Sequence, residues 1–441
     1  MPDGNNSRAD LIRRRDRAMS ASVKTFPIFP RDPMVLTRGE GQYVFDDTGR
    51  RYLDGTAQNL CISLGFGHPL TMAMAGAQMQ AMQHCTTLFY NETQVLYAEE
   101  LAATMPPDSG DWVVHLVNSG AEAIDLAFTM ARVFTRNFEI LTLRNGYHGL
   151  QMGALGSTAF ATCRPPIPPP AGFVSVHHPD QYKGVFGPGV DPYLAEIERT
   201  ISAATCGAVA AMIFEPIQGF GGVVPMPPGY LAAAAEMVRR AGGLVIMDEV
   251  QTGFGRMGSH YWGFAAHDVM PDIVVLGKGM GNGFPISGVI VRREIADAFA
   301  QTRFFNTFGA NPVAVAAARS VIRAIAEEGL QAQAAARGAQ LEAGLRALQS
   351  RHPLIGDVRG CGLIMGFELV RDHITKMPAT EAAEHVQDAL RAAGYICVRG
   401  TPGRNVFRVN PPLCITAADI AGLLEALDNA LASAQRQYGT T

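Results

Sequence analysis

The middle of the chain alternates short apolar runs with segments of helical periodicity, and this alternation constrains the fold more than any other feature. Six apolar runs beyond Trp112 have the length and composition of strands: 113–117, 140–143, 209–214, 244–247, 273–276 and 288–291. Predicted helices occupy 120–134, 191–204, 229–241 and 293–300. Strands alternating with helices predict an α/β fold with a mostly parallel central sheet, covered by helices on both faces.

The Pro- and Gly-rich segment 163–190 is predicted to be a long loop. Before the alternating region, a hairpin is expected over 41–54 and helices over 70–105, with a break near Asn91. After Pro312 come Ala-rich helices to about 350, then mixed elements. The expected strands there are 362–370, 395–398 and 406–409, and the expected helices are near 380–393 and at 416–436.

Length and this change of pattern predict two domains. At 441 residues the chain exceeds the size at which a single hydrophobic core usually stops growing. We expect residues 1–55 to form an N-terminal segment that belongs to the small domain. Residues 56–311 would form the large domain, and 312–441 the smaller α+β domain.

The net charge and the cysteines limit which kinds of partner and which cell compartment we expect. A net charge of −4 gives no reason to expect nucleic acid or an anionic membrane as a partner. The chain has no apolar run of about 18 residues, so no membrane span is predicted. Its seven scattered cysteines favour free thiols and no metal site. Residues 1–7 are polar and lack the apolar stretch of a secretory signal, so we expect a cytoplasmic protein.

Two predicted strands end in a carboxylate and a lysine. Asp248 follows 244–247, and Lys278 follows 273–276 between two glycines. Ligands bind at the carboxyl ends of strands in open α/β sheets, so both side chains are expected to face one site. A carboxylate keeps a pyridine nitrogen protonated, and a desolvated lysine is a nucleophilic amine. Alone, each fits a helix cap or a surface turn; together they favour pyridoxal phosphate (PLP) as cofactor.

Other residues after predicted strands could complete a site for this cofactor. Ser119, Gly120 and Ala121 open a predicted helix, where backbone N–H groups and the helix dipole suit a phosphate. Tyr147 offers a ring to stack on a planar cofactor, although a Tyr-His pair in a turn is more often structural. The remaining candidates at strand ends are His148, Glu215, Val250 and Gln251.

Seven motifs, in order along the chain, resemble those of the class III (ω-amino acid) aminotransferases. They begin at Asn118, Tyr147, Glu215, Asp248, Gly277, Asn306 and Phe407, and the resemblance covers roughly residues 27–436. Within the class, the chain is most similar to the subgroup of alanine–glyoxylate aminotransferase 2 and ethanolamine-phosphate phospho-lyase. The resemblance implies a PLP-dependent transferase of fold type I. It also implies a homodimer or tetramer with active sites at the subunit interface.

The resemblance assigns roles at the cofactor. Lys278 would bind the cofactor aldehyde and move the substrate proton. Asp248 would pair with the pyridine nitrogen, and Gln251 with the ring hydroxyl. Thr307 of a second subunit would join the phosphate site.

It also implies which residues would bind the substrate. Arg408 would bind the carboxylate of the amino acid or oxo acid, a bidentate role that lysine fills poorly. Leu60, Tyr90 and Phe220 would line the substrate pocket.

Two departures from the family pattern bear on the reaction. The family usually has Ser or Thr at Ala121, so one phosphate contact is missing. Many members that use glutamate have a Glu at Phe220, which neutralises the arginine. Without that Glu, Arg408 stays free for a small 2-oxo acid. We therefore expect a transaminase that moves an amino group from a β- or ω-amino acid or amine to pyruvate or glyoxylate.

Two alternatives stay open. A PLP lyase on the same fold would eliminate ammonia or phosphate from an amino-alcohol phosphate, and residues 371–380 are similar to that group. The lyases do not have arginine at position 408, which favours transamination. A non-catalytic binding module is disfavoured because Lys278, Asp248 and Gln251 are all retained.

Overall fold

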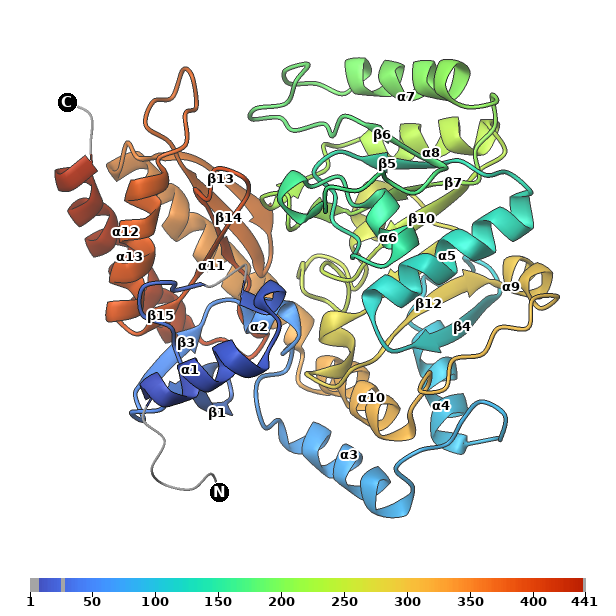
Figure 1. Cartoon of the computed structure of the whole chain (residues 1–441), viewed down its shortest axis with the longest axis horizontal. Coiled ribbons are helices and arrows are strands. Elements are labelled where there is room, and N and C mark those ends of the chain that lie inside the picture. The colour runs from blue at the N-terminus through green and yellow to red at the C-terminus, as the bar shows by residue number, and fades with distance from the viewer. Residues whose placement is uncertain (1–7, 25–27, 439–441) are drawn as a thin grey trace.

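The computed structural model describes residues 8–24 and 28–438 (Figure 1). The polar residues 1–7, used above to predict the compartment, lie outside the described residues. A seven-stranded central sheet has the order β4-β12-β11-β10-β7-β5-β6. Its strands are β4 (Trp112–Val117), β5 (Ile140–Leu143), β6 (Phe173–Val176), β7 (Ala211–Phe214), β10 (Leu244–Asp248), β11 (Ile273–Leu276) and β12 (Ser287–Arg292). Only β12 pairs antiparallel with its neighbours in this sheet, so the predicted mostly parallel α/β sheet is confirmed.

Helices cover both faces of the central sheet, as β10 illustrates. Leu244 and Ile246 pack in the core that includes α5 (Gly120–Thr135) and α9 (Arg293–Phe299). Val245 and Met247 point into the opposite core, which includes residues of α4 (Glu92–Ala102), α7 (Asp191–Ala204) and α8 (Tyr230–Arg240). Because successive strand side chains alternate between faces, fully apolar strands of this kind need two covering layers.

The predicted loop over 163–190 is partly wrong. It contains β6, which pairs parallel with β5 at the edge of the central sheet. The segment before it holds α6 (Met152–Ser157) and the 3-10 turn η2 (Ala161–Cys163). A four-residue edge strand between Pro- and Gly-rich stretches has too few residues for its periodicity to be recognised.

After the central sheet, two long helices lead to a second sheet. These helices are α10 (Pro312–Glu327) and α11 (Leu330–Arg351). A four-stranded sheet, called the C-terminal sheet below, has the order β13-β14-β17-β16. Its strands are β13 (Ile355–Cys361), β14 (Ile364–Leu369), β16 (Val398–Gly400) and β17 (Val406–Val409), and it is accompanied by α12 (Thr380–Ala392) and α13 (Ala417–Tyr438). The sequence did not predict β13.

The predicted strand 395–398 is divided between two sheets. Val398 begins β16, whereas β15 (Tyr395–Ile396) pairs parallel with β3 (Arg51–Asp54). With β1 (Leu36–Glu40) and β2 (Tyr43–Asp46), these strands form a sheet of order β1-β2-β3-β15. Residues near the two ends of the sequence are therefore hydrogen-bonded to each other.

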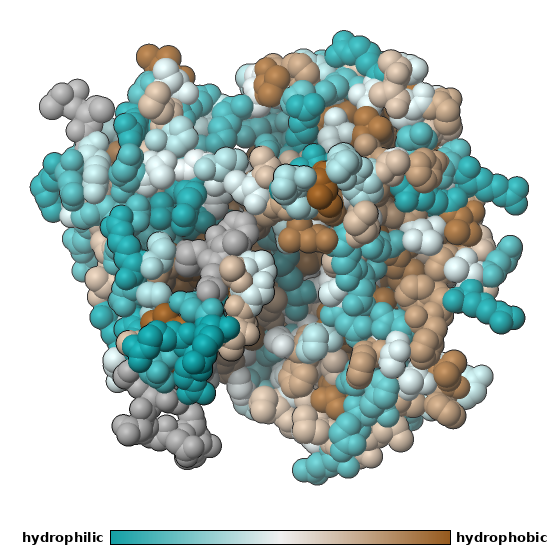
Figure 2. Space-filling model, in the orientation of Figure 1, coloured by the Kyte–Doolittle hydropathy of each residue, from teal (hydrophilic) through white to brown (hydrophobic). Residues whose placement is uncertain are grey.

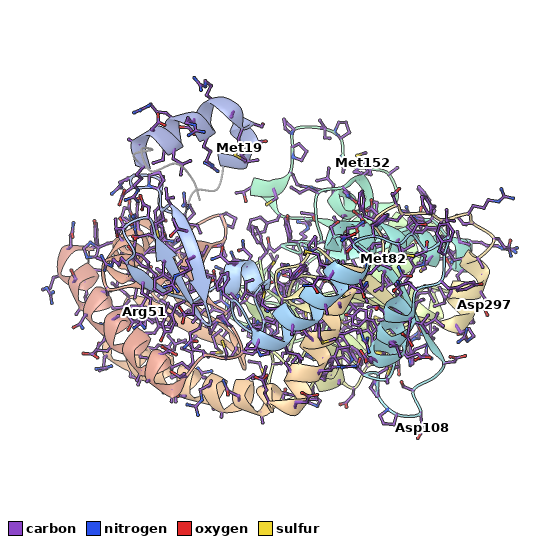
Figure 3. All side chains as sticks on the ribbon, turned by 90° about the horizontal axis from the view of Figure 1, so that it is seen from below. Met19, Arg51, Met82, Asp108, Met152 and Asp297 are labelled. Carbon is purple, nitrogen blue, oxygen red and sulfur yellow. The ribbon has the colours of Figure 1, made fainter. Side chains whose placement is uncertain are left out.

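The remaining elements are short or peripheral. They are α1 (Arg8–Ala18), η1 (Ala21–Lys24), α2 (Ala57–Leu60), α3 (Pro69–Ala81), β8 (Ile217–Gln218), β9 (Val224–Pro225), η3 (Gly263–His267) and η4 (Lys278–Gly281). Helix α1 buries none of its residues and lies at the edge of the molecule beside Met19 (Figure 3). Hydrophilic side chains predominate over the N- and C-terminal elements on the left of Figure 2. None of the helices in the described part of the chain combines the length and apolarity needed to span a bilayer.

Candidate active site

Lys278 lies at the first turn after β11, in the left-handed region of backbone space with φ of 43°. Burial lowers the pKa of the Lys278 ammonium, as does the charge of Arg408, whereas the carboxylates of Asp248 and Glu215 raise it. Lys278 is thus within electrostatic reach of groups from β10, from the residue after β7 and from β17. Its lowered pKa favours the neutral amine, which is the nucleophilic form.

Asp248 ends β10 and forms a buried pair with His148. His148 Nδ1 lies 2.7 Å from Asp248 Oδ2, and the N–H of Val250 donates to Asp248 Oδ1 at 3.1 Å. Burial disfavours the charged form of His148, but the hydrogen bond and charge of Asp248 outweigh it and raise the pKa of His148. The sequence predicted His148 only as a cofactor contact; the structure makes it the partner of the acid.

Glu215 is buried behind the site. It accepts hydrogen bonds from the N–H groups of Tyr147 (3.3 Å) and Gly219 (3.2 Å). Burial, helped by the nearby charge of Asp248, raises the pKa of Glu215 to about 7. Its contacts therefore join two loops that reach the site, those of Tyr147 and Gly219.

Gln251 and Val250 follow Asp248 and lie against glycines. A Cβ on Gly219 would be 2.2 Å from Gln251 Oε1, so a side chain there would displace the amide of Gln251. A Cβ on Gly120 would be 3.7 Å from a methyl of Val250, which places the start of α5 beside the loop after β10.

The start of α5 has the geometry expected of a phosphate site. Ser119 caps the helix and accepts from the N–H of Glu122 at 3.3 Å, and Glu122 in turn accepts from the side chain of Asn306 at 2.8 Å. The methyl group of Ala121 lies against Gly149, where a Cβ would approach it to 2.7 Å. The helix dipole and first-turn N–H groups at this end favour an anion.

Arg408 enters from β17 of the C-terminal sheet and meets an aromatic cluster. Its guanidinium carbon lies 5.1 Å from the centre of the Phe220 ring, and that ring lies 4.7 Å from the ring of Tyr147. Phe160, which the sequence did not single out, packs edge-on against Phe220 at 4.9 Å. Burial lowers the pKa of Arg408 to about 10. Among the described residues, no carboxylate forms an ion pair with it.

The remaining candidates divide into two groups. Leu60 is buried near Lys278, and its carbonyl oxygen would lie 3.2 Å from a Cβ on Gly279. Tyr90 and Thr307, in contrast, are exposed on the surface of the single chain, and the ring of Tyr90 has no cover at all. Among the described residues, no hydrogen bond, ion pair or ring contact joins either of them to Lys278.

The residues present fit PLP. Gln251 Oε1 and Arg408 Nε are buried and have no partner among the described residues. Buried polar atoms are nearly always hydrogen-bonded, so both suit groups of bound ligands. A ring hydroxyl would satisfy Gln251, and a substrate carboxylate would satisfy Arg408. The described residues contain no group of three His, Cys, Asp or Glu placed to hold a metal ion.

Comparisons with known proteins show the family of the chain. The family model described as aminotransferase class-III matches residues 29–431. An Arabidopsis thaliana relative, alanine–glyoxylate aminotransferase 2 homolog 2, mitochondrial, is 42% identical over 421 residues, covering 95% of this chain and 86% of the relative.

Two solved structures are similar over nearly their whole length. One is a phospholyase from Arthrobacter in complex with phosphoethanolamine, with a TM-score of 0.88 and 32% identity, covering 96% of this chain and 100% of that one. The other is an amine transaminase from an uncultivated Pseudomonas species in its PLP-bound form, with a TM-score of 0.86 and 29% identity, covering 94% and 98%. The chain therefore belongs to the class III aminotransferases and is a PLP-dependent aminotransferase.

Proposed function

We propose that this aminotransferase moves an amino group from a β- or ω-amino acid or amine to a small 2-oxo acid, pyruvate or glyoxylate. The observation behind this proposal is the environment of Arg408: it is buried, it faces the ring of Phe220, and it has no carboxylate partner among the described residues. A buried cation without a counterion binds a carboxylate strongly. The Arabidopsis relative, whose name includes alanine and glyoxylate, supports an acceptor of this size.

The cofactor site is proposed to work through residues at or after the ends of three strands, β5, β10 and β11. When bound, PLP supplies an electron-withdrawing ring. Lys278 would provide the amine that holds it and would move the proton at the substrate carbon. Asp248 would hold the proton on the ring nitrogen. His148 would keep the Asp248 carboxylate in place, because His148 Nδ1 lies 2.7 Å from Asp248 Oδ2. Gln251 would accept from the ring hydroxyl.

Other residues would bind the phosphate and the ring of the cofactor, and the substrate. Ser119, Gly120 and Ala121 would hold the phosphate through the start of α5. Tyr147 would stack on the cofactor ring. Leu60 and Phe220 would supply apolar walls for the substrate, and Tyr90, in the surface loop before α4, would join the site of a second copy of the chain.

A second copy of the chain is proposed to complete the site, in a homodimer or tetramer. Six exposed apolar residues, named the interface patch here, support it: Leu88, Phe89, Tyr90, Phe304, Phe305 and Phe308. The two segments are linked, because the rings of His84 and Phe308 lie 5.1 Å apart and Asn311 donates to the carbonyl of Gln83. Thr307 lies within this patch, so a partner seated there could bring its own Thr307 to the phosphate.

Domain limits and compartment are proposals of the same kind. We place the boundaries near residues 55 and 311, so that 1–55 joins 312–441; the pairing of β3 with β15 supports this. The free state of all seven cysteines supports the cytoplasm. Because the Arabidopsis relative is named mitochondrial, cell fractionation is the direct test.

The second candidate is the lyase, because a similar structure is a phospholyase with bound phosphoethanolamine. One experiment separates the two. The holoenzyme is mixed with an amine donor without any acceptor, and its absorbance spectrum is followed. A transaminase converts the aldehyde form of the cofactor into its amine form, and pyruvate or glyoxylate reverses the change. An unchanged spectrum with release of ammonia would identify a lyase. A panel of donors and oxo acids would then define the substrates.

A further inference from the structure

Arg359 of β13 links three separate parts of the chain through a nearly buried guanidinium. Its Nε donates to the carbonyl of Gly222 at 2.9 Å, and its other two nitrogens bind Asp357 at 2.8 Å and Glu368 at 2.9 Å. Glu368 is fully buried and also bonds to Lys183, from the segment between β6 and α7. The two acids that accept hydrogen bonds from Arg359 are thus neutralised. Among the described residues, the bond to Gly222 is the only hydrogen bond from this guanidinium to the loop described next.

Gly222 belongs to a short loop, residues 219–223, that joins β8 to β9 and is called the Phe220 loop here. The loop presses closely on the C-terminal sheet. A Cβ on Gly222 would lie 3.1 Å from Thr401 and 3.2 Å from the guanidinium of Arg359, and φ there is +121°, a conformation that favours glycine. The next residue, Val223, is fully buried. One side of the loop is therefore fixed to this sheet, two residues from Phe220.

The register of the C-terminal sheet explains why Arg359 and Arg408 both reach this loop. Arg359 pairs with Gly366 across β13 and β14, and Gly366 pairs with Arg408 across β14 and β17. Directly paired residues project from the same face of a sheet. The two arginines therefore flank a glycine on one face. A Cβ on Gly366 would lie 2.9 Å from Val223 Cβ, so the gap above this glycine is where the loop sits.

We propose that Arg359 is a positioning residue that determines how the enzyme binds its 2-oxo acid. It holds the Phe220 loop between the two arginines, so that the ring of Phe220 lies on the guanidinium of Arg408 and the arginine stays oriented toward the substrate carboxylate. This inference rests on the proposed role of Arg408 in binding the acceptor. The hydrogen bonds of Arg359 go to Gly222, Asp357 and Glu368, so it acts through the Phe220 loop.

Arg359→Lys is the main test. Lysine keeps a positive charge beside Asp357 and Glu368 but cannot reproduce three directed hydrogen bonds from one planar group. We expect KM for pyruvate to rise about tenfold, which corresponds to about 1.4 kcal/mol. The half-reaction with an amine donor that has no carboxylate should change less than twofold. Calorimetric binding of propanoate, which has the carboxylate but no reactive carbonyl, should weaken by a similar factor.

Lys183→Gln is the matched control, because it removes the other ion-pair partner of Glu368 without touching the Phe220 loop. It should lower thermal stability yet leave KM for pyruvate unchanged. A double-mutant cycle of Arg359→Lys with Phe220→Leu should be non-additive, because both changes act through the same ring. If Arg359→Lys does not fold, Gly366→Ala supplies the test: it displaces the loop at Val223, keeps both arginines, and should raise KM for pyruvate in the same way.

The outcomes separate this inference from the proposed function. A wild-type enzyme that transfers no amino group to any oxo acid would overturn the function. A wild-type enzyme that uses pyruvate, with Arg359→Lys and Gly366→Ala unchanged in KM and in propanoate binding, would overturn the inference alone. Equal effects of Arg359→Lys and Lys183→Gln would show that Arg359 only stabilises the fold.

Discussion

Buried charge is the main feature of the site at the scale of single residues. Lys278 and Arg408 each lose hydration, and burial lowers the pKa of both side chains. Asp248 has His148 as a close partner, whereas Arg408 has an aromatic ring and no acid among the described residues. The site therefore has spare positive charge where a substrate carboxylate would bind.

Arg408→Gln is expected to impair the use of pyruvate much more than the binding of PLP. Removing one partner of a buried charge pair costs about 2–5 kcal/mol, which would appear in kcat/KM for the oxo acid. PLP affinity, measured by absorbance titration of the apoenzyme, should stay within about twofold. If acceptor kinetics are unchanged, Arg408 does not bind the substrate carboxylate.

Glu249 should make stability depend on pH near neutrality. It is buried, accepts from Thr252 Oγ1 (2.6 Å) and from the N–H groups of Gly263 (2.9 Å) and Phe264 (2.7 Å), and burial raises its pKa to about 7. The folded state holds this proton up to a higher pH than the unfolded state does. The stability that protonated Glu249 contributes is therefore fully present below about pH 4, and it is lost as the pH rises to about 7.

The corresponding measurement is thermal unfolding between pH 5 and pH 8 for the wild type and Glu249→Gln. The wild type should lose stability relative to the variant as the pH rises, by an amount on the order of 3 kcal/mol. Parallel curves for the two proteins would contradict the raised pKa.

Among the elements, α2 is the most unusual because it turns in the left-handed sense. Its four residues, Ala57 to Leu60, have φ values of 47°, 48°, 59° and 67°. Side chains make this conformation unfavourable, and runs of it are rare. Two interactions offset the strain. Asp54 accepts four hydrogen bonds from Thr56 and Gln58, and Leu60 packs in a small core with Ile217, Val223, Met257 and Ile364.

This strained turn lies against the segment that carries Lys278. A Cβ on Gly279 would lie 2.1 Å from Ser63 Oγ, and Leu64 donates its N–H to Asn282 at the end of η4. The turn therefore helps to fix the loop of the catalytic lysine.

Asp54→Ala is expected to lower the free energy of unfolding by about 2–4 kcal/mol, because two buried donors of Thr56 and two partly buried donors of Gln58 lose their acceptor. It should also slow the reconstitution of the apoenzyme with PLP, since α2 packs beside Lys278. Asp46→Ala is the matched control: Asp46 also accepts from a threonine two residues on, but in the turn between β2 and β3. Equal reconstitution rates for both variants would show that α2 does not help to fix the loop of Lys278.

For the whole molecule, the exposed interface patch is the feature that a single chain does not explain. Leu88, Phe89 and Phe308 are 73%, 70% and 62% exposed. Exposed patches of large apolar side chains usually mark an interface with another molecule. The two predicted site residues that are exposed in the single chain, Tyr90 and Thr307, both lie here. The proposed second copy of the chain would cover this apolar surface and bring these residues to a site.

Phe308→Glu should therefore convert the protein to monomers and lower its activity by at least about tenfold, because a buried unpaired charge costs several kcal/mol. Light scattering and sedimentation would measure the mass. Ile374→Glu is the control, since Ile374 is 92% exposed on the loop after β14, away from the patch. A wild-type protein that is monomeric and fully active would contradict the proposed assembly.

The sequence by itself determined the alternating strands and helices, and with them the residues at strand ends: Asp248, Lys278 and the start of α5. These features depend on local periodicity and on glycines beside the strands. Only the tertiary structure decided the pairing of β3 with β15, the division of the predicted strand 395–398 and the strands that the sequence did not predict, among them β6 and β13. It also decided the partner of Asp248 and the contact of Arg408 with Phe220, a pair 188 residues apart in the numbering. Such contacts depend on how whole sheets and loops pack, and no local pattern in the chain records them.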